Sequence, residues 1–173
     1  MAETLAAAMV FPPVVSKAVE ESAAAFFKSS CNMTHVPNGT VDENDLGAAG
    51  IMSTISFMGD PPWAFAMAFP EESAVTIAKV FAGFEIEFDS PDMGDLVGEI
   101  ANVIAGDITA RLHRKGIKAP MSLPTVVRGS NVSLLTPTGG SSTRLVYAGP
   151  GGTCWFNLVG TRTDGVTFRR PGM

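Results

Sequence analysis

The chain is poor in charged residues and in the residue types that build metal and disulfide sites. Charged residues make up 17% of its 173 residues and hydrophobic ones 46%, which excludes a disordered chain. The two cysteines and two histidines, Cys31, Cys154, His35 and His113, lie far apart without ligand spacing. We therefore expect no metal site and no disulfide framework, and we expect the cysteines to be small apolar core residues.

Basic residues and long hydrophobic runs are also scarce. Twelve Lys and Arg stand against seventeen Asp and Glu, a net charge of −5, which is the wrong sign for binding nucleic acid or an anionic membrane surface. Residues 129–143 and 145–161 are uncharged but interrupted by glycine or proline, so no transmembrane helix is expected. Residues 1–11 lack the basic region of a secretory signal, and a cytoplasmic location is the default expectation.

Three segments have the pattern of helices. In residues 13–31 apolar residues recur close to every 3.6 positions, and residues 71–83 begin with two glutamates and end with a glycine. Residues 90–116 give the clearest helix, with Ser90 as the N-cap and Pro91 at the first helical position. The length fits one domain, residues 1–173, with a core of about 12–160.

The remaining segments have the pattern of strands. Residues 50–58 and 63–70 alternate around a Gly-Asp-Pro-Pro turn and predict an antiparallel hairpin. Further strands are predicted, between turns rich in Gly and Pro, at 119–127, 132–135, 144–147 and 154–159. The order of helix, strands, two helices and strands favours an α+β fold, with helices packed on a largely antiparallel sheet.

The predicted long helix has two distinct faces. Its apolar residues are expected to face the core: Leu96, Val97, Ile100, Val103, Ile104, Ile108 and Leu112. A second row steps by three or four residues and is expected to face outward: Asp95, Glu99, Asn102, Gly106, Thr109 and His113. Small residues flank this row at Gly98, Ala101 and Ala105. We expect another molecule to approach the helix closely there and to meet one carboxylate and one carboxamide.

The spacing Asp95-x3-Glu99-x2-Asn102-x21-Pro124 resembles the signature of the CheC/CheX/FliY chemotaxis phosphatases, in which Asp or Ser, Glu, Asn and a distant Pro occur at these intervals. The string GEIANVIAG also resembles the helix core of that family, and the order of elements resembles its whole domain from about residue 12 to 159. CheC-type proteins usually have two copies of the motif. Here the first helix has only Ser16-x3-Glu20-x2-Ala23, which is either a degraded copy or a set of ordinary helix residues, so the single copy favours the CheX type.

The resemblance implies an activity and a partner. The family hydrolyses the aspartyl phosphate of a CheY-like response regulator, which supplies its own Mg²⁺ and lysine, so no cofactor is expected in this chain. An Asn carboxamide can orient the attacking water, and Asn102 is the candidate for that role. Glu99 is expected to pair with the lysine of the regulator.

The other matched positions are expected to have supporting roles. Asp95, Gly98, Ala101 and Gly106 are candidates for contact with the partner, and Pro124 for shaping the strand beneath the helix. Because CheX proteins are homodimers that join their sheets, a homodimer is also expected.

Two other classes of function stay open. The same fold could act without catalysis, as a dimerising adaptor or as a flagellar-switch component resembling the FliM middle domain. The acidic surface and the Gly-rich C-terminal strands could also serve an unrelated ligand, which the sequence does not specify. His113 at the end of the long helix is interpreted as a cation facing the helix dipole.

Overall fold

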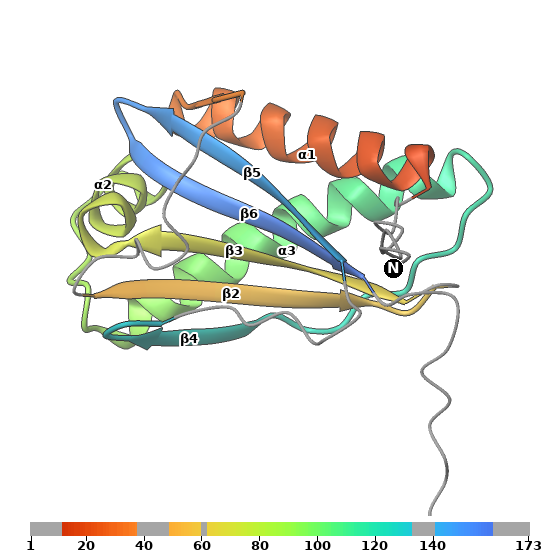
Figure 1. Cartoon of the computed structure of the whole chain (residues 1–173). Helices are drawn as coiled ribbons and strands as arrows, with labels where there is room; N and C mark the ends of the chain where they lie inside the picture. Colours follow the sequence, from red (N-terminus) through yellow and green to blue (C-terminus); the bar gives the residue numbers. More distant parts are fainter. Residues whose placement is uncertain (1–11, 38–48, 60–61, 133–140, 161–173) are drawn as a thin grey trace, which may run out of the picture.

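The computed structural model describes residues 12–37, 49–59, 62–132 and 141–160. In these ranges three helices pack on one six-stranded antiparallel sheet, which confirms the predicted α+β class and order of elements (Figure 1). The elements are α1 (Pro13–Cys31), β1 (Thr34–His35), β2 (Gly50–Phe57), β3 (Trp63–Pro70), α2 (Glu71–Ala82), α3 (Pro91–His113), β4 (Thr125–Gly129), β5 (Ser141–Gly149) and β6 (Gly152–Gly160). A single domain over residues 1–173 stays a prediction, because both chain ends lie outside the described ranges.

The helices begin and end where local chemistry places their boundaries. The Ser90 hydroxyl accepts a hydrogen bond from the Met93 amide at 3.3 Å and caps α3, with Pro91 in the first turn. Helix α2 ends at Gly83, whose φ of 81° favours glycine. None of the helices that the structure describes is long and apolar enough to cross a membrane.

The strand order is β1-β5-β6-β3-β2-β4, with every pair antiparallel. The predicted hairpin is confirmed as β2 and β3, paired from Gly50 with Pro70 to Phe57 with Trp63. Residues 60–61 of its turn lie outside the described ranges, as does most of the strand predicted at 132–135.

The strand predicted over 119–127 is shorter in the structure and begins only at Thr125. Two prolines, Pro120 and Pro124, lack the amide hydrogen that a continuous ladder needs. The chain before β4 instead forms single hydrogen bonds with the end of β2. The Met58 amide donates to the Pro120 carbonyl, and the Ser122 amide donates to the Ser56 carbonyl, each at 2.8 Å. This segment stays extended beside the sheet, next to α3.

The main core lies between the helices and one face of the sheet. Figure 1 shows α3 crossing behind the sheet, and buried residues of all three helices form one cluster with the inward side chains of β2, β3 and β6. The alternation predicted for β2 is confirmed, since Ile51, Ile55 and Phe57 are almost fully buried on that face. A smaller buried cluster, Met52, Ala66, Ala68, Val146 and Trp155, belongs to the alternate positions of the strands.

Both cysteines belong to the main core, as predicted. They are free and almost fully buried, and burial raises the pKa of the Cys31 thiol to about 11. Burial also raises the pKa of the Cys154 thiol. Each thiol is therefore protonated at neutral pH, which suits a packing role and not a nucleophilic one.

The tip of the β5–β6 hairpin contacts the helices through glycine backbone. Gly152 has φ 103°, and a Cβ there would lie 2.5 Å from the Ser73 hydroxyl oxygen, which accepts a hydrogen bond from the Thr153 amide. A Cβ on Gly149 would overlap the carbonyl oxygen of Asn32, at the end of α1. The Gly-rich turn predicted from the sequence therefore also allows close packing of this tip against the start of α2 and the end of α1.

Candidate functional site

The predicted outward row of α3 is exposed or half-buried along its whole length, from Asp95 to His113. Glu99 is exposed and Asn102 is half-buried, and their separation of three residues places both side chains on one surface. Within the described part of the chain, neither side chain has a hydrogen-bond or ion-pair partner. The carboxylate and the carboxamide are therefore available to another molecule.

The flank of this row differs from the prediction at all three small residues, because Ala105 is fully buried as well as Gly98 and Ala101. Gly98 and Ala101 were expected to be accessible to a partner, but both are buried, and Ala101 has no exposed surface. A Cβ on Gly98 would lie 3.5 Å from Cγ2 of Val126 and 3.7 Å from Cγ of Pro124. Both distances are ordinary van der Waals contacts, so Gly98 faces Pro124 and Val126 on the β4 side and not a partner. Gly106 differs, because it is exposed and a Cβ there would meet no atom within 4 Å.

One residue predicted for the core lies at the surface. Val103 is 44% exposed, because it follows Glu99 by one helical turn and lies at the edge of the outward row. The other six apolar residues predicted for the core are buried: Leu96, Val97, Ile100, Ile104, Ile108 and Leu112.

A second segment of chain borders the site on the side of Asn102. Gly98, Asn102 and Thr109 lie on one side of α3, since they are separated by four and seven residues. Pro124 is next to Gly98, and the Thr109 hydroxyl lies 3.8 Å from the Met121 sulfur. Asn102 lies between these two contacts, so the chain from Met121 to Pro124 runs beside it. The proline of the motif thus lies where α3 meets the start of β4.

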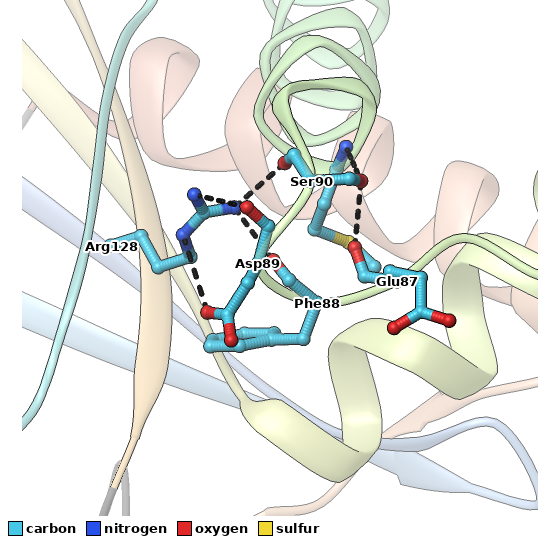
Figure 2. A network of polar contacts seen from close by, with 6 residues as sticks. Glu87, Phe88, Asp89, Ser90 and Arg128 are labelled. Atoms are coloured by element: carbon cyan, nitrogen blue, oxygen red, sulfur yellow. Dashed lines mark hydrogen bonds and ion pairs between the residues drawn. The ribbon is translucent and has the colours of Figure 1, made fainter.

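Arg128 of β4 fixes the start of α3 (Figure 2). Its guanidinium donates to the carbonyl oxygens of Phe88, Asp89 and Ser90 at 2.6, 2.8 and 2.7 Å, and it lies 5.9 Å from the centre of the Phe88 ring. These carbonyls belong to the three residues before the first turn of α3. Arg128 therefore ties the beginning of the helix with Glu99 and Asn102 to the strand that follows Pro124. Sequence reasoning missed this residue.

Replacing Arg128 with Met is expected to lower the free energy of unfolding by about 1–2 kcal/mol, because three carbonyls lose a charged donor whose side chain is partly exposed. Arg128→Lys should recover less than half of the loss, since an ammonium group lacks the planar fork that reaches all three carbonyls. Urea unfolding of both variants measures this. Lys118→Met, at another exposed cation, is the control, and an equal loss there would contradict the assignment.

On its other side, α3 is joined to α1 by an ion network. The Arg111 guanidinium contacts Asp107 Oδ2 and Glu21 Oε2, each at 2.7 Å. Burial raises the pKa of Asp107, but the hydrogen bond from Arg111 and the positive charge of Arg111 outweigh burial, so the pKa lies below its usual value. A carboxyl with a lowered pKa adds stability at neutral pH, and this contribution is lost as the pH falls through that pKa.

The first helix has no second copy of the site. Ala23, at the position of the motif asparagine, has no exposed surface and belongs to the main core. The interpretation of Ser16, Glu20 and Ala23 as a degraded motif therefore gains no support from the geometry. The described residues also contain no group of three His, Cys, Asp or Glu that could hold a metal ion.

Comparison with known families and structures links this geometry to one group of proteins. The family model described as chemotaxis phosphatase CheX matches residues 51–147, more than half of the chain. Asp95, Glu99, Asn102 and Pro124 all fall inside the matched range. Comparison with curated protein sequences gave no match.

Solved structures share the fold over most of the chain. A CheC-like superfamily protein from Shewanella sp. PV-4 has a TM-score of 0.74 and 21% identity, over 88% of this chain and 100% of that one. Chemotaxis protein CheX from Vibrio vulnificus has a TM-score of 0.70 and 20% identity, over 83% and 97%. The CheX–CheY–BeF3–Mg²⁺ complex from Borrelia burgdorferi has a TM-score of 0.66 and 18% identity, over 86% and 98%. Because the sequence identities are only 18–21%, these comparisons establish that the fold is shared.

Proposed function

The chain belongs to the chemotaxis phosphatase CheX family, and from this premise we propose that it hydrolyses the aspartyl phosphate of a CheY-like response regulator. The observation that supports the proposal best is the pairing of Glu99 and Asn102 on one accessible surface of α3. The Borrelia burgdorferi protein of the same fold in complex with CheY supports the class of partner.

In the proposed reaction, Asn102 orients the attacking water. An acyl phosphate is already activated, so the missing element is a water held in line with the phosphorus. The Asn102 carboxamide oxygen accepts a hydrogen bond from this water, while its amide group donates to a neighbouring acceptor of the regulator. The side chain needs no change of protonation for this task.

Glu99 is proposed to anchor the complex. Its carboxylate precedes Asn102 by almost one helical turn and enters the regulator site beside it. There it pairs with the lysine that holds the phosphoryl oxygens. The Mg²⁺ ion of the reaction is the regulator's own, and this chain needs to supply only the carboxylate and the carboxamide.

The direct test uses receiver domains from the source genome, phosphorylated with acetyl phosphate and freed of excess donor. Adding the protein should accelerate phosphate release from one or more of them well above the autodephosphorylation rate. Tight binding of a phosphorylated receiver without acceleration would instead support the non-catalytic adaptor or switch-like module. A homodimer formed through a sheet edge, where β4 and β1 lie, and a cytoplasmic location remain parts of the proposal.

Gly106→Ala is expected to separate stability from partner binding. Gly106 is an exposed glycine inside α3 with free space around its Cβ position, so alanine should raise the free energy of unfolding by roughly 0.5–1 kcal/mol. Because the glycine lies one turn after Asn102, the added methyl should hinder close approach and raise KM for the phosphorylated receiver about threefold.

Gly94→Ala is the matched control, because Gly94 is also helical and its Cβ position is equally free. It should increase stability without changing KM. Equal kinetic behaviour of the two variants would show that Gly106 is not at the contact surface.

A further inference from the structure

Three exposed apolar side chains lie on α3 and on the chain segment that flanks the proposed site. Leu123 is 85% exposed, the highest value among the large hydrophobic residues that the structure describes, while Val103 is 44% and Met121 36% exposed. Single exposed apolar residues are ordinary, but a group of them beside a functional pair is typical of a contact surface. We call Val103, Met121 and Leu123 the apolar rim.

The backbone places Leu123 at about the level of Asn102 along α3. Pro124 lies against Gly98, and one residue of extended chain advances about 3.3 Å, while one helical residue advances about 1.5 Å. Leu123 is therefore level with the helical turn that runs from Gly98 to Asn102. Its neighbour Ser122 bonds to the edge of β2, and the Leu123 side chain projects away from the protein.

Val103 lies on the opposite flank of the row. It follows Glu99 by four residues, on the side of α3 that leads to Asp107, and therefore away from the Met121–Pro124 segment. The polar pair thus lies between Val103 on one side and Leu123 with Met121 on the other. A polar centre with apolar flanks fits a surface that closes over the pair and excludes bulk water.

We propose that the apolar rim is the docking surface for the phosphorylated receiver domain, with Leu123 as its principal contact. This inference rests on the proposed function. To orient a water at the phosphorus, Asn102 must come within hydrogen-bond distance of that water, so the receiver surface must cover the side chains beside Asn102. Leu123 is adjacent and more exposed than Asn102, and it is buried when the receiver docks.

The rim is expected to act on binding and not on the chemical step. Val103, Met121 and Leu123 have no group that can orient water or neutralise a phosphoryl oxygen. Their burial removes the same apolar area from water in the ground state and in the transition state, so it stabilises both states equally. A change at Leu123 should therefore raise KM and leave kcat nearly unchanged.

The test measures binding to receiver domains saturated with beryllofluoride and Mg²⁺, which cannot turn over, by titration calorimetry with the full chain. Leu123→Asp should weaken binding about tenfold or more, and Leu123→Ala should weaken it less. Val36→Asp is the matched control, because Val36 is 37% exposed and follows β1 at the opposite edge of the sheet. Thermal melts should show both Leu123 variants folded, since Leu123 is almost fully exposed, and Val36→Asp counts as the control only when its melt shows the same folded state.

The outcomes separate the docking surface from the catalytic proposal. If the wild type dephosphorylates a receiver and Leu123→Asp binds it normally, the rim assignment is overturned and the phosphatase stands. If a receiver binds in a Leu123-dependent way but is not dephosphorylated, the rim stands and the catalytic proposal fails. If Leu123→Asp only converts a dimer to a monomer, the occupant is a second copy of this chain and the proposal is wrong. Failure of the wild type to bind any receiver overturns both.

Discussion

Replacing Asn102 with Ala is expected to lower kcat for receiver dephosphorylation by about 10²–10³-fold, close to the rate of the receiver alone. The loss has this size because a preorganised polar group that acts at the reacting centre contributes a few kcal/mol to the barrier. KM should change much less, since the contacts of Glu99 and Leu123 with the receiver remain. Phosphate release under single-turnover conditions, at saturating concentrations of the variant, measures the effect.

The fold should be unaffected by this change, because the Asn102 side chain has no hydrogen-bond partner within the described residues. The free energy of unfolding should stay within about 0.5 kcal/mol of the wild type. Thr109→Ala, two turns further along the same side of α3, is the control and should keep full activity. A normal kcat in Asn102→Ala would remove this residue from the mechanism.

Replacing Glu99 with Ala is expected to raise KM for the phosphorylated receiver about 10- to 100-fold. A charge-assisted hydrogen bond to the lysine of the receiver contributes roughly 1.5–3 kcal/mol, and each 1.4 kcal/mol corresponds to a tenfold change in affinity. The effect on kcat should be smaller, because Asn102 still orients the water. Initial rates over a range of receiver concentrations separate the two parameters.

Two further variants test whether loss of the negative charge of Glu99 causes the rise in KM. Glu99→Gln keeps the shape of the side chain and removes the charge, so it should behave much like Glu99→Ala. Asp95→Asn makes the same charge change one turn earlier on the exposed row and should have only a small effect. If both charge changes weakened binding equally, the role of Glu99 would be general electrostatic attraction and not a specific pair.

The features predicted best are those set by periodicity along a single element. The positions of Glu99 and Asn102 follow from the helical repeat of residues 90–116, and the β2–β3 hairpin follows from its alternation. Val103 was misplaced because a helical pattern does not fix where an apolar face ends. The strand predicted from residue 119 was too long, because an extended, partly apolar segment beside a sheet need not join its ladder.

The features that could not be predicted depend on contacts between distant segments. Arg128 lies 38 residues from Ser90, and nothing in the sequence between them indicates that its guanidinium reaches three carbonyls there. The burial of Gly98 likewise depends on the arrival of Pro124 and Val126 against the helix. The exposure of Leu123 could not be predicted either, because it depends on how residues 120–124 lie against β2 and α3.

The 21 residues between Asn102 and Pro124 form the path by which the chain returns from α3 to the edge of the sheet. The chain leaves Asn102 along the helix to His113, reverses, and comes back as the extended segment beside β2. Neighbouring residues of an extended segment face opposite ways, so its register decides which side chain emerges beside the carboxamide. A slip of this segment by one residue against β2 would place Ser122 or Pro124 where Leu123 now lies, but it would also break the bonds between Ser122 and Ser56 and shift the register of β4. The pairing of this segment with β2, and not the helix, therefore determines which side chain a partner meets next to the two motif side chains.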